Sequence, residues 1–293
     1  MSLSRRSFLL TLGVAAIAAC KRDAVAGRSR PLVIALGPAY APKSAEALRA
    51  AWASASGLTL ELRVLPSATA VIDALQGGRA DAGLLSLIDY LYCHDVLGAE
   101  PIAQVVRGQG RATQSGELVV QASFDGAALA SLAGKRVGFV DQLSTTGFLL
   151  PAARLREAKV AFEPVWLGSH DAVLAAVESG SVAAGATYAG HASGRPPLRV
   201  LAETGSIANE PVFVASTVPA DVRAALAKGL TAAAPPGALD GVADVTGFRA
   251  ADSKDYATAS DRVRAAGREV EDLVPGGWRR ANEQRRPMWS YGQ

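Results

Sequence analysis

The chain has 293 residues, of which 49% are hydrophobic and 19% are charged, and its formal net charge is +3. This length accommodates one large domain or two domains of medium size. A surface that binds nucleic acid needs a far more basic chain, so we expect no nucleic-acid partner. The chain has only two cysteines, which are too few for a disulfide framework.

The first twenty residues have the pattern of a bacterial export signal. Arg5 and Arg6 stand together before the apolar run TLGVAAIAA, which is typical of a Tat signal and too short for a membrane span. The run ends in IAAC, which resembles the lipobox of bacterial lipoproteins. We therefore predict that residues 1–19 are a signal peptide and that the mature protein is a periplasmic or cell-surface lipoprotein, anchored to the membrane only through lipidated Cys20. An ordinary secretory signal with a chance cysteine is the alternative.

Two segments about one hundred residues apart repeat one pattern. The sequence AVIDALQGGRADAGLLS (70–86) aligns with AVLAAVESGSVAAGATY (172–188) at several valine, alanine and glycine positions. Each copy reads as an amphipathic helix that ends at a glycine, which adopts the left-handed cap conformation easily, and a short strand follows. Further apolar strands are predicted before each copy, at 31–37, 58–65, 134–140 and 160–167.

The repeat predicts two βαβαβ units, and therefore an α/β protein of two lobes, each a mostly parallel sheet flanked by helices. Alternating strands at 117–123 and 210–216 leave the two units and are suited to a pair of hinge strands. The helices that follow, including one expected over SKDYATASDRVRAAGREVEDL, are predicted to return to the first lobe. The resulting boundaries place lobe one at 31–118 plus 214–290 and lobe two at 119–213.

A loop rich in hydroxyl groups follows the strand at 134–140. Ser144, Thr145, Thr146 and Gly147 stand between that strand and a leucine-rich helix. The unpaired N–H groups at a helix start bind anions, and three hydroxyl groups add hydrogen-bond donors while the glycine permits close approach. Plain N-capping of the helix is the alternative interpretation, but capping needs only one hydroxyl. We therefore predict an anion site at this loop.

Few other residues point to chemistry. His170 follows a strand end in LGSHDAV, close to the predicted anion loop, while Asp171 is suited to cap the next helix and His94 and His191 are expected to be core or surface residues. No histidine has the spacing of a zinc site, and neither a G-x-S-x-G elbow nor a P-loop occurs. We therefore expect no catalytic residue, metal or cofactor. Because Tyr188 ends a predicted strand of lobe two, it is a candidate to line the space between the lobes.

Three stretches carry a resemblance to a known family. LAGKRVGFVDQLSTTGFLLPAARL, GSHDAVLAAVESGSVAAGAT and VLAETGSIANEPVFV resemble the phosphate, phosphite and phosphonate binding proteins of ABC importers, which have the type 2 periplasmic-binding-protein fold. In that family the hydroxyl loop and a histidine hold the oxyanion, and a tyrosine of lobe one closes over it. The resemblance implies these roles for Ser144, Thr145, Thr146, His170 and Tyr90. It leaves open which of Tyr40, Tyr90, Tyr92 and Tyr188 line the cleft.

The resemblance also implies a function and a partner. We expect a monomeric binding protein, not an enzyme, that captures a small oxyanion between its lobes and delivers it to an ABC permease. Ala183 stands where the family commonly has an acidic residue, which favours a simple oxyanion over an aminoalkyl phosphonate. A ligand sensor for a membrane signalling receptor is the alternative function, and a sulfonate or another anion is the alternative ligand.

Overall fold

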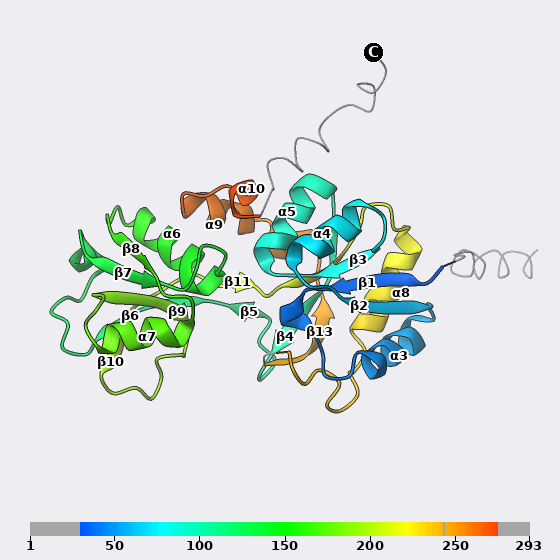
Figure 1. Cartoon of the computed structure of the whole chain (residues 1–293), viewed down its shortest axis with the longest axis horizontal. Helices are drawn as coiled ribbons and strands as arrows, with labels where there is room; N and C mark the ends of the chain where they lie inside the picture. Colours follow the sequence, from blue (N-terminus) through cyan, green and yellow to red (C-terminus); the bar gives the residue numbers. More distant parts are fainter. Residues whose placement is uncertain (1–29, 243, 275–293) are drawn as a thin grey trace, which may run out of the picture.

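The computed structural model describes residues 30–242 and 244–274. They form two α/β lobes that lie side by side along the long axis of the molecule and are joined by two linking strands (Figure 1). Cys20, the predicted signal peptide and residues 275–293 lie outside the described residues. Within the described ranges, none of the helices combines the length and the apolar composition that crossing a membrane requires.

Lobe one contains a six-stranded sheet with the order β13-β4-β12-β3-β1-β2. Strand β1, between β3 and β2, is buried along its whole length, as expected for a strand covered by helices on both faces. The strands are β1 (Leu32–Leu36), β2 (Leu60–Val64), β3 (Ala82–Leu84), β4 (Glu100–Arg107), β12 (Pro211–Val214) and β13 (Val245–Ala250). The helices are η1 (Pro38–Tyr40), α3 (Ala45–Ser56), α4 (Ala68–Gln76), α5 (Leu87–Leu97) and α8 (Ala220–Leu230).

Lobe two contains a five-stranded sheet with the order β10-β6-β9-β7-β8. Its strands are β6 (Gly116–Gln121), β7 (Arg136–Phe139), β8 (Glu163–Trp166), β9 (Ala184–Tyr188) and β10 (Leu198–Glu203). Its helices are η2 (Leu129–Leu132), η3 (Thr145–Leu149), α6 (Leu150–Glu157) and α7 (His170–Glu178). The helix η3 is a single π-type turn that continues directly into α6.

The sequence repeat corresponds to a repeat in the structure. Ser67 caps α4 and Ser169 caps α7, and each side chain accepts a hydrogen bond from the third residue of its helix, at 3.1 and 3.2 Å. The order β2-β1-β3-β12-β4 in lobe one matches β8-β7-β9-β6-β10 in lobe two, strand for strand. The two lobes are therefore built to one plan.

Most strands of each sheet run in one direction, as predicted, but both sheets are mixed. Strands β1, β2 and β3 pair in parallel, and so do β7, β8 and β9. The strand that enters each sheet from the other lobe, β12 or β6, is antiparallel to its neighbours on both sides. Its direction is opposite because it starts at the linker, where the parallel strands end.

The linkers themselves are two short strands, β5 (Thr113–Gln114) and β11 (Ile207–Ala208), which pair antiparallel with each other between the lobes (Figure 1). The hinge strands were predicted at 117–123 and 210–216, but those residues belong mainly to the sheet strands β6 and β12. The true linkers come just before them in the chain. The predicted lobe boundaries at 118 and 213 therefore fall inside sheet strands, a few residues beyond the linkers.

The register of the strands places the carboxyl ends of the parallel strands at the linkers. Tyr188, the last residue of β9, pairs with Gly116, the first residue of β6. In lobe one, Leu84 at the end of β3 pairs with Val212 near the start of β12. Ligands of open α/β sheets bind beyond the carboxyl ends of the strands. Both lobes therefore direct their ligand-binding edge toward the space between them.

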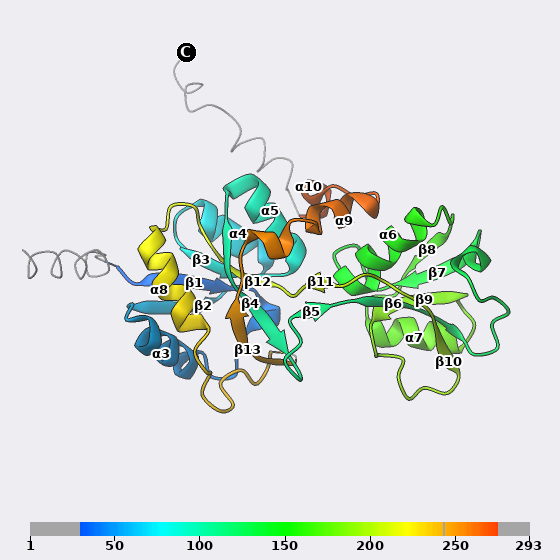
Figure 2. The same cartoon turned by 180° about the vertical axis from the view of Figure 1, so that it is seen from behind.

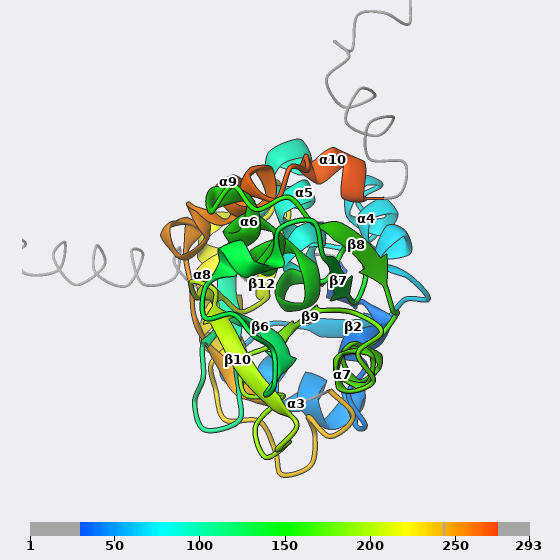
Figure 3. The ribbon, with the colours of Figure 1, turned by 90° about the vertical axis from the view of Figure 1, so that its left-hand side faces the viewer.

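Of the helices predicted to return to lobe one, α8 packs against α3 there, whereas the last helices of the described chain connect both lobes. The chain forms η4 (Ser253–Tyr256), α9 (Ala259–Ala265) and α10 (Val270–Leu273) in place of one continuous helix, and Gly267 between α9 and α10 has a φ of +72°. Helix α9 packs against α6 of lobe two and α10 packs against α5 of lobe one, as seen from behind in Figure 2 and along the long axis in Figure 3. We call residues 253–273 the strap.

Candidate anion-binding site

The hydroxyl loop lies where strand β7 ends and helix η3 begins. Ser144 is the N-cap, and its Oγ accepts a hydrogen bond from the backbone N–H of Gly147 at 3.0 Å. Thr145 and Thr146 are the first two residues of the helix, and the N–H groups at such positions have no partner within the helix. One hydroxyl therefore caps the helix, as the alternative interpretation supposed, while the two threonines leave further donors for a ligand.

Gly147 is required by packing as well as by its place in the loop. A Cβ atom at this position would lie 2.5 Å from Cγ2 of Val140 and 2.7 Å from Oγ of Ser144. The Gly147 carbonyl also accepts a hydrogen bond from the backbone N–H of Val140 at 3.2 Å. The turn between β7 and η3 is thus closed tightly enough that only glycine fits without a shift of its neighbours.

His170 is the first residue of α7 and stands next to the anion loop in the sheet order, because β7 and β8 are neighbouring strands. Its Nδ1 lies 2.9 Å from Oγ1 of Thr187, a fully buried residue of β9. The same Thr187 oxygen lies 2.8 Å from Nδ1 of His191. His191 in turn places its Nε2 3.2 Å from Oδ1 of Asp171. Hydrogen bonds join His170 to Thr187 and Thr187 to His191, and His191 lies at ion-pair distance from Asp171. We call these four side chains the relay.

The relay corrects two expectations about individual residues. Asp171 does not cap α7, because Ser169 holds that position, and it contacts His191 and, at 3.3 Å, Arg195. His191 is neither a simple core residue nor a simple surface residue, since its ring stacks on Tyr188 with centroids 4.4 Å apart.

Electrostatics link the relay to the anion loop. Partial burial lowers the pKa of His170 below its usual 6.5, and nearby His191 lowers it further, while Asp141 and Asp171 oppose the shift. Asp141 belongs to the turn that precedes Ser144, and its negative charge acts on the His170 imidazole. Burial therefore favours the neutral form of His170.

Tyr188 shows that the two lobes approach each other at this edge. It is 44% exposed, and the edge of its ring faces His170 with centroids 5.0 Å apart. Burial and the charges of Asp171 and Asp244 raise the pKa of Tyr188, while Arg111 and Arg195 oppose the rise. Arg111 and Asp244 belong to lobe one and form an ion pair there. Tyr188 therefore lies where lobe-one charges act on lobe two.

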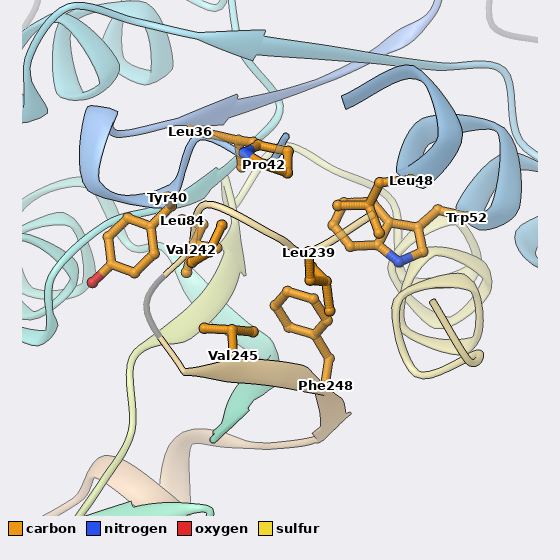
Figure 4. A pocket seen from close by; sticks show the side chains of 10 residues that line it. All are labelled: Leu36, Tyr40, Pro42, Leu48, Trp52, Leu84, Leu239, Val242, Val245 and Phe248. Carbon is orange, nitrogen blue, oxygen red and sulfur yellow. The ribbon is translucent and has the colours of Figure 1, made fainter. Parts of the chain in front are cut away.

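Lobe one contributes a polar cluster that sequence reasoning missed. Arg107, at the end of β4, places its Nη2 2.9 Å from Oε2 of Glu210, the residue before β12. The Tyr40 hydroxyl also hydrogen-bonds Glu210, and burial followed by the charge of Glu210 raises the pKa of Tyr40. Figure 4 shows the Tyr40 hydroxyl turned away from a small apolar pocket that its ring helps to line, beside Leu36, Leu84 and Val242. No charged residue lines this pocket, so it is not suited to an anion. The Tyr40 hydroxyl, on the side of Glu210 and Arg107, is the part of Tyr40 that could take part in anion binding.

Tyr90 does not lie at the site, which corrects the role that the resemblance implied for it. The side chain is fully buried in α5 and packs against Phe213 and Tyr256, with ring centroids 5.4 and 5.0 Å away. Tyr92 is fully buried as well. Of the four tyrosines considered, Tyr188 alone is exposed, and Tyr40 is the one from lobe one with a polar cluster around its hydroxyl.

The sequence contains only weak signals for the site residues that it did not predict. Thr187 is adjacent to Tyr188 in the repeat, but its contact with His170 depends on how β9 and α7 pack, which no spacing reveals. The pairing of Arg107 with Glu210 joins positions 103 residues apart. Among the described residues, no group of three or more His, Cys, Asp or Glu side chains has the arrangement of a metal site.

The fold and the site together define the class of protein. Two lobes of one plan, two linking strands and a polar edge on each lobe at the linkers are the features of a type 2 periplasmic binding protein. The chain belongs to the family described as "ABC transporter, phosphonate, periplasmic substrate-binding protein", whose model matches residues 36–256. Members of this family are extracytoplasmic solute-binding proteins of transporters rather than enzymes.

Solved structures support the same fold. The chain is similar to XAC2383 from Xanthomonas citri bound to ATP, with 21% identity, 83% of this chain and 99% of that chain covered, and a TM-score of 0.66. It is similar to PhnD1 from Prochlorococcus marinus in complex with methylphosphonate, with 16% identity, coverage of 80% and 98%, and a TM-score of 0.57. It is also similar to PA3383 from Pseudomonas aeruginosa, a binding protein component of an ABC phosphonate transporter, with 15% identity, coverage of 90% and 100%, and a TM-score of 0.55.

Proposed function

We propose that this protein captures a small oxyanion of the phosphonate, phosphite or phosphate type between its lobes and delivers it to an ABC permease. The observation that carries the proposal is the convergence of two helix N-termini at one edge of lobe two. The start of η3 offers Ser144, Thr145 and Thr146, and the start of α7 offers His170. Each set alone is too weak for micromolar affinity, which needs roughly 8 kcal/mol.

Contacts from lobe one complete the proposed site. Tyr40, Arg107 and Glu210 lie beside the linkers, and Tyr188 lies where the charges of both lobes act on it. Closure of the lobes around the anion would bring these groups together and exclude water, which strengthens each charge-assisted hydrogen bond. A methylphosphonate-bound relative and an ATP-bound relative support a phosphorus oxyanion as the ligand class.

A ligand panel tests this proposal directly. The protein is melted in the presence of methylphosphonate, phosphite, phosphate, ATP and methanesulfonate, and hits are measured by calorimetry. A ligand at a thousand times its Kd stabilises the folded state by about 4 kcal/mol, which a thermal melt detects easily. We expect one of the small phosphorus anions to give the largest shift. A largest shift with methanesulfonate, or no shift with any phosphorus anion, would contradict the proposal.

We further propose that the protein is exported by the Tat route and held at the outer face of the membrane by lipid on Cys20. The support is the twin arginine of Arg5 and Arg6, the short apolar run and the IAAC sequence. Lipid anchoring would keep the binding lobes at the membrane that holds the permease.

A further inference from the structure

The relay ends at the one nitrogen of His170 that no described residue contacts. Nδ1 of His170 is occupied by Thr187, whereas Nε2 has no hydrogen-bond partner among residues 30–242 and 244–274. In the proposed site it is Nε2 that meets the anion. Whether Nε2 carries a hydrogen therefore decides which anions it accepts.

The carboxylate at the other end fixes the direction of the hydrogen bonds. Asp171 is a carboxylate, so the Nε2 atom of His191, which lies 3.2 Å from its Oδ1, faces it with a hydrogen rather than with a lone pair. Neutral His191 then has a lone pair at Nδ1, and the Thr187 hydroxyl donates its single hydrogen to it. The Thr187 oxygen is left to accept from Nδ1–H of His170. Neutral His170 therefore presents a lone pair, not a hydrogen, at Nε2.

We propose that Thr187, His191 and Asp171 are positioning residues that make Nε2 of His170 a hydrogen-bond acceptor, so that the site selects an oxyanion carrying an acidic hydrogen. This inference rests on the proposed function of the same site. The monoanion of a phosphonate or of phosphate has a P–OH group that donates to Nε2. A sulfonate has no such hydrogen and places an oxygen lone pair against the nitrogen lone pair, so a site built this way rejects it.

One added proton reverses the direction of the hydrogen bonds in the relay. When His191 is an imidazolium, its Nδ1–H donates to Thr187, the Thr187 hydroxyl donates to Nδ1 of His170, and Nε2 of His170 carries the hydrogen. A proton on His170 itself has the same result at Nε2. A sulfonate can therefore bind only after the pair of histidines has taken up one proton.

The surroundings set how readily that proton is taken up. The charged and titratable groups around His170 are Asp141 from the turn after β7, Asp171 from α7, Tyr188 from β9 and Arg195, which pairs with Asp171. Burial, followed by the charge of His191, lowers the pKa of His170 and so favours its neutral form.

Nitrogen NMR on the ligand-free, full-length exported protein tests the relay without any ligand. Histidine labelled with nitrogen-15 reports separately on Nδ1 and Nε2, and His170→Gln and His191→Gln assign the signals. We expect His170 to be protonated at Nδ1 and bare at Nε2 at about pH 7.5, and His191 to be protonated at Nε2. A hydrogen on Nε2 of neutral His170 would overturn the inference. This result stands even if no phosphonate binds, in which case the proposed function fails and the relay does not.

Calorimetry with two probes tests the selectivity. Methylphosphonate and methanesulfonate are titrated into the same protein from about pH 6 to about pH 8. We expect methanesulfonate affinity to fall by about tenfold per pH unit once the histidine pair is deprotonated, because binding requires one proton. The methylphosphonate monoanion carries the P–OH hydrogen that the site needs. Its affinity should therefore stay constant as the pH rises, until its second ionisation removes that hydrogen. Methanesulfonate affinity that does not change with pH would overturn the inference.

Variants of the relay separate orientation from simple structural support. His191→Phe keeps a ring against Tyr188 and removes the acceptor for Thr187, whose hydroxyl is then free to donate to His170. We expect methanesulfonate affinity at about pH 7.5 to increase by roughly tenfold or more. Damage to the fold would lower the affinity for both probes. Thr187→Val should remove the pH dependence for methanesulfonate, and Thr187→Ser should keep it. The inference would be overturned if His191→Phe lost affinity for both methylphosphonate and methanesulfonate while Thr187→Val kept the wild-type ratio of the two affinities.

Discussion

The Ser144 hydroxyl oxygen accepts a hydrogen bond from the backbone N–H of Gly147 at 3.0 Å, which makes Ser144 the cap of the helix that follows. Thr145, its neighbour, has no capping role. Ser144 therefore stabilises the helix in a way that Thr145 does not, and substitutions at the two adjacent positions should have different effects on stability.

Thr145→Ala should weaken methylphosphonate binding with little change in melting temperature. Loss of one donor to a charged ligand costs about 1.5–3 kcal/mol, which is roughly ten- to a hundredfold in affinity. Ser144→Ala is the matched variant, and it should lower the free energy of unfolding by about 1 kcal/mol. Calorimetry and thermal melts on both variants measure the two quantities. Equal affinity of Thr145→Ala and wild type would place the ligand elsewhere.

Gly147→Ala should destabilise the fold. The added Cβ would lie 2.5 Å from Cγ2 of Val140, and overpacking of this kind costs about 1–3 kcal/mol. The double variant Gly147→Ala with Val140→Ala should recover part of that loss, because the closest atom is gone. Chemical denaturation of wild type, the two single variants and the double variant measures the coupling. Strictly additive losses would show that the two residues do not interact as described.

His170 should make the folded state less stable in mild acid. Its pKa is lower in the folded chain than the 6.5 of an unfolded chain, so the unfolded chain binds more protons between those two values. The free energy of unfolding should therefore decrease as the pH falls through this interval, with no contribution above 6.5. Denaturation of wild type and His170→Gln over about pH 5 to 7.5 isolates the effect. A His170→Gln curve with the same acid slope as wild type would refute this assignment.

Tyr90→Phe should leave ligand affinity unchanged and should not lower stability. The Tyr90 hydroxyl is buried and has no hydrogen-bond partner within the described part of the chain, and burial raises its pKa strongly. A buried polar group without a partner costs about 1–3 kcal/mol, so removal of the oxygen carries no loss of a hydrogen bond. Tyr40→Phe is the contrasting variant, because its hydroxyl bonds Glu210. Weaker methylphosphonate binding by Tyr90→Phe would restore the tyrosine to the site.

Cys20→Ser should move the protein from the membrane fraction to the soluble fraction, or stop processing of the signal peptide. Lipid on the cysteine is the only anchor that the sequence predicts. A second variant, Arg5→Lys with Arg6→Lys, should reduce export by the Tat route specifically. Fractionation and blotting of cells that express each variant give the result. Equal membrane association of Cys20→Ser and wild type would exclude the lipoprotein.

The sequence predicted what depends on local pattern and missed what depends on register. The repeat at 70–86 and 172–188 predicted two helices that end at glycines, and the structure has α4 and α7 there, followed by Gly78 and Gly180 at positive φ. The direction of β6 and β12, which run against the parallel strands, was not predicted, because apolar patterns show that a strand is buried but not which way it runs. Thr187 was missed for a related reason: its partners come from the start of α7 and from the turn after β9, and their meeting depends on three-dimensional packing.

The strap gives the molecule a third attachment between its lobes, through α9 on α6 and α10 on α5. Within it, Arg262 approaches Glu157 of lobe two at 3.8 Å, and the Arg268 guanidinium lies 5.9 Å from the ring centre of Phe148, which belongs to the helix that starts at the anion loop. Two linkers alone would permit the lobes to twist as well as bend, whereas a third contact beside α6 resists torsion. We therefore expect one rotational axis near the strap, and an entrance for solutes on the opposite face, where the same rotation produces the widest displacement.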